Sequence, residues 1–306
     1  MQRQKFELLI LGSSSAAPTT QRNPSAQLLN IAERFFLIDC GEATQIQLRR
    51  YKAKFQKIDH IFISHLHGDH FFGLPGLLSS MHLLGRKQDL HVYCPPELKE
   101  IVEKLNSVAD TKFNYKLIWH INSNKSLDLL FEDEKVQVYS FPLKHRIFCT
   151  GFLFREKPLH RKIDKAKLAK NKVSVANIHK LRIGEDIVND EGKKIKNKDL
   201  TLDPEPPRNF AYCSDTIYDE TLVKYIKGVD LLYHESTFLN DKEKRAKDTF
   251  HSTAEQAAKI AKAAKVKTLL LGHYSARYGD TQPFIDQAQP FFKNVLLASE
   301  GKKLEI

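Results

Sequence analysis

The sequence has few cysteines and no long apolar stretch, and each shortage excludes a class of protein. Its four cysteines, at positions 40, 94, 149 and 213, form no Cys-x-x-Cys pair, so we expect buried free thiols in a reducing compartment. No run approaches the roughly 20 apolar residues needed to cross a bilayer. The apolar run at residues 6–11 is too short for a signal peptide and is typical of a first strand. We therefore expect a cytoplasmic protein without a membrane segment.

Acidic residues are fewer than basic ones, and the basic excess is concentrated in one segment of the chain. The 306-residue chain has 37 Asp and Glu against 48 Lys and Arg, a net charge of +11. Such an excess favours polyanionic partners, although net charge alone is equally compatible with simple solubility. Residues 155–182 hold ten Lys and Arg against two Asp and Glu, so most of the excess lies there. This segment is either an ordinary solvated face or part of an inserted arm, at residues 155–200, that holds a nucleic-acid backbone.

Strand-like and helical stretches are mixed along the chain. Strands are expected near residues 6–11, 35–39, 60–64, 90–94, 127–131, 136–141, 209–213, 229–233, 268–271 and 294–298. Helices are expected near residues 71–84, 96–105, 219–227, 253–265 and 282–291. The helix at 253–265 opens with Ser252-Thr253-Ala254-Glu255, which is typical of a capping box. This mixture, in a chain long enough for one large core or a core plus an appendage, favours a layered α/β arrangement.

One short loop carries most of the functional information. Residues 65–70 read His-Leu-His-Gly-Asp-His and follow the apolar, strand-like run at residues 61–64. Imidazole nitrogen and carboxylate oxygen are ligands that borderline divalent metals such as Zn²⁺ accept. A lone histidine after a strand is usually solvated or hydrogen-bonded, but three imidazoles and a carboxylate this close together indicate a metal site. In an extended turn His65 and His67 can face one metal, while Asp69 and His70 can face a second.

Three further candidate ligands lie downstream in one recurring context. His145 follows the alternating stretch at residues 136–141, Asp215 follows residues 210–214, and His273 follows residues 268–272. Each sits where a strand is expected to end, which is where open sheets gather functional groups. Asp215 is the natural bridge between two metals, because a carboxylate has two oxygens.

This order of groups resembles the metallo-β-lactamase superfamily and, within it, the ribonuclease Z family, zinc phosphodiesterases that remove 3′ trailers from precursor tRNA. Further segments are similar to motifs of that family: residues 11–15, 18–23, 39–45, 234–237, 251–253 and 272–278. The likeness runs nearly from end to end. The His-Ser-Thr triplet at residues 251–253 is its most discriminating part, since small-molecule hydrolases of the superfamily generally lack it there.

The resemblance implies a fold, a cofactor and a reaction. The fold is a four-layer αββα sandwich, a single domain over residues 1–306 with the basic segment as its tRNA-binding arm. Two Zn²⁺ per subunit activate water to attack phosphorus, which leaves a 3′-hydroxyl on the tRNA and a 5′-phosphate on the trailer. Mn²⁺ and Fe²⁺ accept the same ligands. One ion is held by His65, His67 and His145, and the other by Asp69, His70 and His273, with Asp215 between them. The family also implies a homodimer in which one subunit's arm serves the other's active site.

The resemblance further implies roles for residues around the metals. Asp69 is the proton acceptor, or else only a ligand that orients the nucleophile. His251 donates a proton to the leaving oxygen, or else caps a helix and touches a phosphate. His234 either hydrogen-bonds a metal ligand or supports the structure. Asp39 and Glu42 stabilise the site loops. The candidate phosphate or nucleotide contacts are Arg22, Asn23, Arg277 and the main chain of Ser252 and Thr253.

The chain departs from the family pattern at three places. Thr20 stands where the Arg-Asn loop has Lys, Ser214 stands where Gly is frequent, and the basic segment lacks the Gly-Pro turn of several relatives' arms. Three functions are compared: a tRNA 3′ endonuclease, a small-molecule hydrolase of the same fold acting on phosphodiesters, sulfate esters or lactones, and a nucleic-acid-binding protein whose metal site is structural or degenerate. The basic segment favours the first over the second, and the complete ligand set argues against the third.

Overall fold

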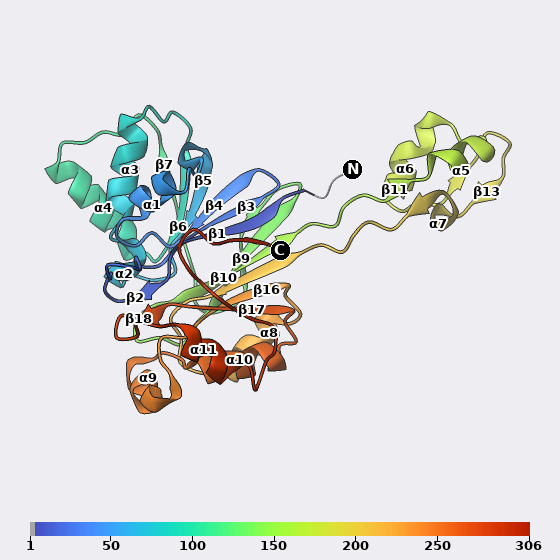
Figure 1. The fold of residues 1–306 in the computed structure, drawn as a ribbon. Helices are drawn as coiled ribbons and strands as arrows, with labels where there is room; N and C mark the ends of the chain where they lie inside the picture. Colours follow the sequence, from blue (N-terminus) through green and yellow to red (C-terminus); the bar gives the residue numbers. More distant parts are fainter. Residues whose placement is uncertain (1–3) are drawn as a thin grey trace. The chain divides into compact units, whose positions relative to one another are not determined.

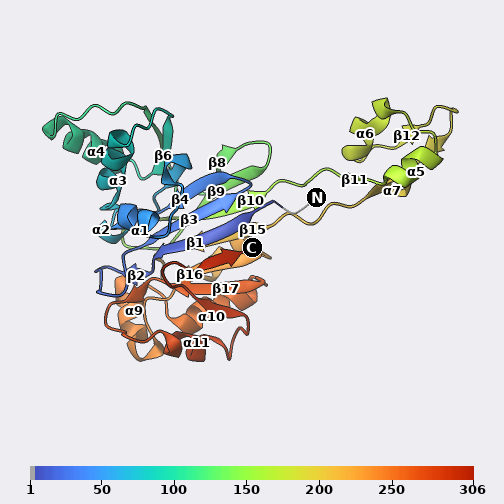
Figure 2. The same ribbon diagram turned by 45° about the horizontal axis from the view of Figure 1, so that its top comes forward.

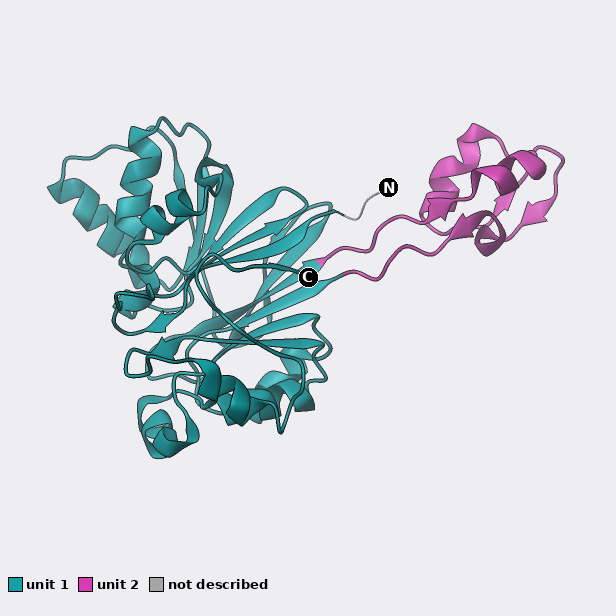
Figure 3. Ribbon diagram, viewed as in Figure 1, with its two compact units in different colours: residues 1–155, 208–306 teal, residues 156–207 magenta. Residues whose placement is uncertain are grey.

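The computed structural model describes residues 4–306, and the chain divides into two compact units (Figure 3). Unit 1 is built from Met1–Arg155 and Arg208–Ile306, and unit 2 is Glu156–Pro207. Unit 2 covers the segment in which we expected an arm at residues 155–200. Its C-terminal boundary lies later than expected because β14 (Thr201–Leu202) pairs with β11 (Lys162–Ile163).

Unit 1 contains two seven-stranded sheets, in the orders β20-β1-β3-β4-β5-β6-β7 and β19-β17-β16-β15-β10-β9-β8 (Figures 1 and 2). The strands of the first sheet are β1 (Phe6–Gly12), β3 (Ala26–Ile31), β4 (Arg34–Ile38), β5 (Ile58–Phe62), β6 (Leu90–Cys94), β7 (Leu117–Ile121) and β20 (Lys303–Glu305). Those of the second are β8 (Asp128–Glu132), β9 (Val136–Pro142), β10 (Thr150–Glu156), β15 (Asn209–Cys213), β16 (Leu231–Glu235), β17 (Thr268–Gly272) and β19 (Val295–Leu297).

Helices cover the outer face of each sheet, which makes four layers. The helices α1 (Thr44–Arg50), α3 (Leu74–Leu83) and α4 (Glu97–Val108) share a core with the first sheet. The helices α8 (Val223–Ile226), α10 (Ala254–Ala263) and α11 (Gln282–Ala288) share one with the second. A third core lies between the sheets: along β17, Leu270 belongs to it while Leu269 and Leu271 face the helices, because side chains of a strand alternate. The αββα sandwich that the sequence implied is confirmed.

Aromatic side chains dominate the core between the sheets. Phe62 is fully buried, and its ring centre lies 4.5 Å from that of Tyr93 and 5.4 Å from those of Phe152 and Phe154. Phe62→Ala is expected to lower the free energy of unfolding by about 3–5 kcal/mol, because neighbours fixed in two sheets cannot collapse into the cavity. Urea unfolding followed by circular dichroism measures this change. Leu83→Ala, at a side chain that is 79% exposed, should have little effect, and equal losses in both variants would disprove this description of the core.

Most of the expected strands and helices are present, and the differences have local causes. The sequence did not predict β3, because Gln27 and Asn30 interrupt its apolar pattern although both are buried. The expected helix at residues 71–84 is two helices, α2 (Gly68–Phe71) and α3. The capping box of α10 joins Thr253 and Gln256, one residue later than the sequence indicated. The remaining elements of unit 1 are β2 (Ser14–Ser15), η1 (Phe55–Lys57), η3 (Glu220–Leu222), η4 (Asn240–Lys242), α9 (Glu243–Thr249) and β18 (Tyr274–Ser275).

Unit 2 has a small core of its own, formed by Leu181, Ile187, Ile195 and Leu200. The buried amide of Asn197 donates to two main-chain oxygens, at 2.8 and 2.9 Å, and so ties neighbouring loops together. The other elements of unit 2 are α5 (Lys165–Lys170), η2 (Val175–Asn177), α6 (Ile178–Arg182), β12 (Ile187–Val188), β13 (Lys194–Ile195) and α7 (Asn197–Leu200). This core gives the basic segment a defined fold.

Two expectations about the whole chain can be compared with the structure. Within residues 4–306, no helix combines the length and apolar character that a membrane span requires. All four cysteines are buried and free, as predicted.

Candidate metal centre

Loops at the ends of four strands bring the expected ligands together. His65 and His67 lie in the loop after β5, and Asp69 and His70 lie in α2, which follows that loop. The strands β9, β15 and β17 each precede one further ligand. The last of these loops is fixed by parallel pairing of β18 with β2. We call the resulting group the His–Asp cluster, and its members are His65, His67, Asp69, His70, His145, Asp215 and His273.

One half of the cluster comprises His65, His67, His145 and Asp215, whose ligand atoms all lie within 4.8 Å of one another. The Nδ1 atom of His67 lies 3.1 Å from Nε2 of His65 and 3.2 Å from Nε2 of His145. The Oδ2 atom of Asp215 lies 3.5 Å from Nε2 of His65 and 3.8 Å from Nε2 of His145. Four ligand atoms from three loops therefore surround one position.

The other half comprises Asp69, His70 and His273. Nε2 of His70 and Nε2 of His273 lie 3.2 Å apart, and Oδ2 of Asp69 lies 3.4 and 3.3 Å from them. Asp215 faces this half with its other oxygen, since Oδ1 lies 3.4 Å from Nε2 of His70 and 3.2 Å from Nε2 of His273. Asp215 thus presents one carboxylate oxygen to each half.

These separations suit a divalent metal. With zinc bonds of about 2.0–2.1 Å, neighbouring ligands of a tetrahedral site lie about 3.3 Å apart. The distances given above between ligand atoms run from 3.1 to 3.8 Å. Nitrogen and oxygen donors of this kind accept Zn²⁺, Mn²⁺ and Fe²⁺. The residues present therefore fit the metal that the fold family implies.

Asp39 orients the His70 ring of the cluster through the ring nitrogen that faces away from the other ligands. Its Oδ2 lies 2.8 Å from Nδ1 of His70 and accepts a hydrogen bond of 2.7 Å from the hydroxyl of Tyr212. Its Oδ1 accepts the main-chain N–H of Ser64 at 2.8 Å. Contacts of this kind fix the tautomer and the ring orientation of a ligand. Three other imidazoles are oriented in the same way, each through its Nδ1 atom. The partners are Ser64 Oγ for His65 at 3.0 Å, the main-chain oxygen of Phe250 for His145 at 3.0 Å, and Thr237 Oγ1 for His273 at 2.9 Å.

Burial and neighbouring charges set the protonation states. Burial lowers the pKa of His65 to about 4, and it also lowers the pKa of His67 and of His145. Burial opposes ionisation of Asp69 and Asp215, but the surrounding imidazoles outweigh it and hold the pKa of both carboxyls well below the usual range. Neutral imidazole and ionised carboxylate are the forms that bind metals, and these residues favour them. At His70 burial disfavours the charged form, but the carboxylates of Asp69 and Asp215 outweigh it and raise the pKa well above its ordinary value, so a metal must displace a proton there.

Glu235, at the end of β16, lies beside the cluster and was not among the site residues expected from the sequence. Its Oε1 lies 2.9 Å from Nδ1 of His251, and its Oε2 accepts the hydroxyl of Thr237 at 2.7 Å. Burial disfavours a charged His251, but the Glu235 carboxylate outweighs it and raises the pKa of His251 to about 9. The adjacent His234 donates to the main-chain oxygen of Glu235 at 2.7 Å and makes no hydrogen bond to the cluster within the described residues. Of its two expected roles, structural support fits this placement.

We predict that Glu235→Gln lowers the pKa of His251 in metal-free protein from about 9 toward or below its ordinary value, because the opposing carboxylate is lost. Nuclear magnetic resonance titration of the imidazole measures this pKa. A folded-state pKa above the ordinary value stabilises the fold fully below pH 6.5, and that contribution is lost as the pH rises through about 9.

The variant should therefore lose more stability near pH 6 than near pH 9.5. Glu255→Gln, which breaks a surface pair with Lys259, serves as the control and should leave the pKa of His251 unchanged. A pKa of His251 that is the same in Glu235→Gln and in the unmodified protein would refute the pairing.

Most candidate RNA contacts have partners within the protein. Arg22 is buried and its Nη2 donates to a main-chain oxygen at 2.6 Å, while the main-chain N–H of Asn23 donates to a carboxylate at 2.9 Å. The hydroxyl of Ser252 donates to a main-chain oxygen at 2.7 Å, and that of Thr253 caps α10. These four residues brace loops, and only Arg277 is exposed.

Two further expectations need correction. Glu42 is exposed and makes no hydrogen bond to the site loops within residues 4–306, so Asp39 carries the stabilising role we expected of both. His251 does not cap α10, because the cap is Thr253. Instead, Nδ1 of His251 lies 3.9 Å from Oδ2 of Asp215, next to the cluster.

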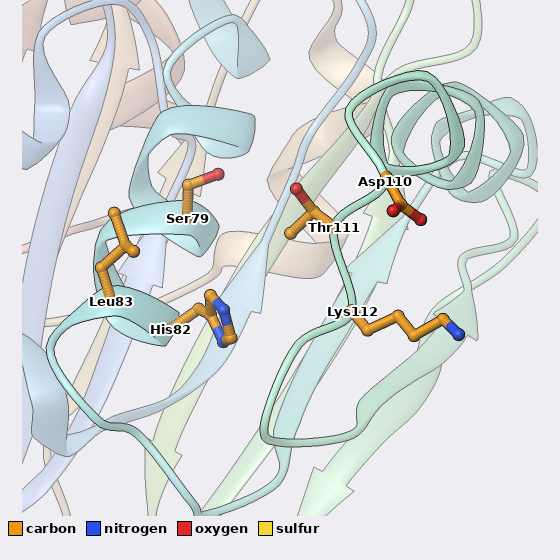
Figure 4. A pocket seen from close by; sticks show the side chains of 6 residues that line it. All are labelled: Ser79, His82, Leu83, Asp110, Thr111 and Lys112. Atoms are coloured by element: carbon orange, nitrogen blue, oxygen red, sulfur yellow. The ribbon is translucent and has the colours of Figure 1, made fainter.

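The surface of unit 1 also has a hollow of about 560 Å³ between α3 and the segment that follows α4 (Figure 4). It is lined by Ser79, His82, Leu83, Asp110, Thr111 and Lys112. None of these belongs to the His–Asp cluster, so the hollow has no part in this site.

Two helix-covered sheets with histidines and aspartates at the ends of their strands define a metallo-β-lactamase fold. In agreement, residues 177–274 match the family model described as beta-lactamase superfamily domain, and residues 6–107 match that of anti-Pycsar protein Apyc1. The chain belongs to the ribonuclease Z family, as its relatives show. It is 46% identical to ribonuclease Z of Bacteroides thetaiotaomicron over 99% of this chain and 96% of the relative. It is 48% identical to ribonuclease Z of Cytophaga hutchinsonii over 98% of this chain and 96% of the relative.

The crystal structure of human tRNase Z, short form, is similar over 97% of this chain and 98% of that chain, with a TM-score of 0.71 and 27% identity. The resemblance inferred from the sequence is thereby confirmed.

Proposed function

We propose that this chain is a zinc-dependent endoribonuclease that removes the 3′ trailer from precursor tRNA, leaving a 3′-hydroxyl on the tRNA and a 5′-phosphate on the trailer. The observation that supports it best is the His–Asp cluster, with the two oxygens of Asp215 directed to different halves, in a chain of the ribonuclease Z family. A small-molecule hydrolase could share the cluster but has no use for the basic segment in unit 2.

We propose that two zinc ions would be held by the cluster, one by His65, His67 and His145 and the other by Asp69, His70 and His273, with Asp215 offering one oxygen to each half. Ions held there would supply Lewis acidity, which would make water nucleophilic at neutral pH and offset charge on the phosphoryl oxygens. The same ligands accept manganese and iron.

Asp69 and His251 transfer the two protons of the reaction. Asp69 orients the attacking water and accepts its proton, and the main-chain N–H of Ala16 holds this carboxylate in place with a hydrogen bond of 2.7 Å to Oδ2. As water bonds to phosphorus, the bond from phosphorus to the 3′ oxygen breaks. His251, kept charged by Glu235, donates a proton to that leaving oxygen.

Unit 2 is our candidate for the tRNA-binding arm. Its exposed cations are Lys162, Lys165, Lys167, Lys170, Lys172, Lys180 and Arg182, followed by Lys193, Lys194, Lys196 and Lys198. Phosphate contacts from such side chains supply affinity that does not depend on sequence, which suits an enzyme that accepts many tRNAs. We further propose a cytoplasmic homodimer, as in the family, and analytical ultracentrifugation tests the dimer directly.

The decisive test of function is to incubate the purified protein with a precursor tRNA transcript and map the new ends. We expect one cut at the start of the trailer with the end groups named above. Removing divalent metals with a chelator should stop cleavage, and adding zinc back should restore it. A ladder of shortened trailers, or intact RNA with metal-replete protein, would reject the proposal.

A further inference from the structure

Two residues with exposed aromatic side chains adjoin the His–Asp cluster. We propose that Phe72 and Phe250 are platforms on which the bases flanking the scissile phosphodiester stack. This inference rests on the proposed function and adds how the reacting nucleotides are positioned.

Phe72 is held against the ligand loop while most of its surface stays in water. It directly follows α2, and its side chain is 61% exposed. A Cβ atom added to Gly68, the residue between His67 and Asp69 in sequence, would meet this ring at 2.2 Å. The ring also meets that of Phe71 edge-on, with centres 4.9 Å apart. Phe72 is therefore a fixed aromatic surface within a few residues of the ligands.

Phe250 occupies a backbone conformation that its side chain disfavours. It ends α9 with φ 59° and ψ 47°, a left-handed position that glycine or asparagine normally takes. A bulky residue there is a genuine outlier, and such strain persists mainly where function requires it. Its main-chain oxygen holds His145, and the residue is 38% exposed. The residue that carries this phenyl group is thus anchored to a ligand through its main-chain oxygen, at a cost in backbone energy.

Scattered exposed apolar residues are common on proteins and need no explanation. Phe72 and Phe250 differ from such residues. The ring of Phe72 packs on Gly68, between two ligands in sequence, and Phe250 has a strained backbone whose carbonyl oxygen contacts His145. Every base has a π-face, so stacking on aromatic rings binds RNA without regard to sequence, as a trailer of variable sequence demands.

The test for Phe72 compares variants of similar volume on two substrates. Phe72→Leu should raise KM for precursor tRNA about tenfold with kcat little changed, while Phe72→Tyr, which retains the π-face, should behave as the unmodified protein. On a precursor with abasic nucleotides at both sides of the cleavage site, all three proteins should have the same KM. Stacking by Phe72 is excluded if the Leu and Tyr variants have the same KM for the normal precursor. It is also excluded if the raised KM of the Leu variant persists on the abasic precursor.

The test for Phe250 separates stability from binding. Phe250→Gly keeps the main-chain oxygen and relieves the left-handed strain, so the melting temperature should not fall, while KM for precursor tRNA should rise about tenfold. Asp110→Gly, at a left-handed residue with φ 46° after α4, is the matched control and should leave KM unchanged. A Phe250→Gly protein with normal KM would overturn the assignment. Failure of the unmodified protein to cleave precursor tRNA would instead overturn the proposed function.

Discussion

Asp215→Ala is expected to lower the rate of precursor tRNA cleavage by about 1,000-fold or more, the largest effect of any substitution outside the fold's core. Its two oxygens face different halves of the cluster, so the change removes a ligand from both at once. It also removes the negative charge that accompanies the buried imidazoles of His65, His70 and His273. Single-turnover cleavage of labelled precursor tRNA measures the rate.

Two further variants make this result interpretable. Asp215→Asn keeps the shape but offers a single oxygen, so it should also lose most activity. Asp286→Ala, at an exposed carboxylate on α11, should cleave normally. If Asp215→Ala cleaved RNA at an undiminished rate while remaining folded, a mechanism based on metals in this cluster would be wrong.

Removal of unit 2 is expected to reduce precursor tRNA cleavage at least about 100-fold while turnover of a small chromogenic phosphodiester survives, because the phosphate contacts are lost and the cluster is not. The pairing of β10 with β15, in which Arg155 is opposite Asn209, allows a clean deletion. Residues 157–206 can be replaced by a short glycine-containing hairpin loop, since antiparallel neighbours need only a few connecting residues.

The control retains unit 2 and changes only its charge. Replacing Lys165, Lys167 and Lys170 of α5 with Glu should raise KM for precursor tRNA and weaken its dependence on salt concentration, with turnover of the small substrate unchanged. Equal activity of the deletion variant on both substrates would mean that unit 2 does not bind tRNA, and would favour a small-molecule hydrolase.

The ligand set could be predicted from the sequence because its chemistry is local. Three imidazoles and a carboxylate within residues 65–70 have few other uses, and each remaining member follows an apolar run that ends a strand. The structure brings all seven together, and Asp215 has the two-sided placement that its two oxygens suggested. The mixture of strands and helices predicted a layered α/β fold, and the family resemblance implied the αββα sandwich that the structure shows.

The surrounding contacts could not be predicted, because they depend on packing between distant segments. Glu235 lies in a strand that is buried along its whole length, and its contact with His251 arises only when β16 meets the loop before α10. The main-chain oxygen of Phe250 has no sequence signal at all. Arg22 was expected to touch RNA because its charge is visible in sequence, whereas its burial is not. The C-terminal boundary of unit 2 depends on the pairing between β11 and β14. These strands are too short to be recognised from the sequence.

The central claim is that one pair of divalent ions lies within the His–Asp cluster. Anomalous diffraction from crystals of zinc-replete protein, with data collected on both sides of the zinc absorption edge, tests it most directly. We predict two peaks per chain, one beside each oxygen of Asp215, each surrounded by the histidines of its own half. A map with no peak there, or with zinc bound by other residues, would contradict the account.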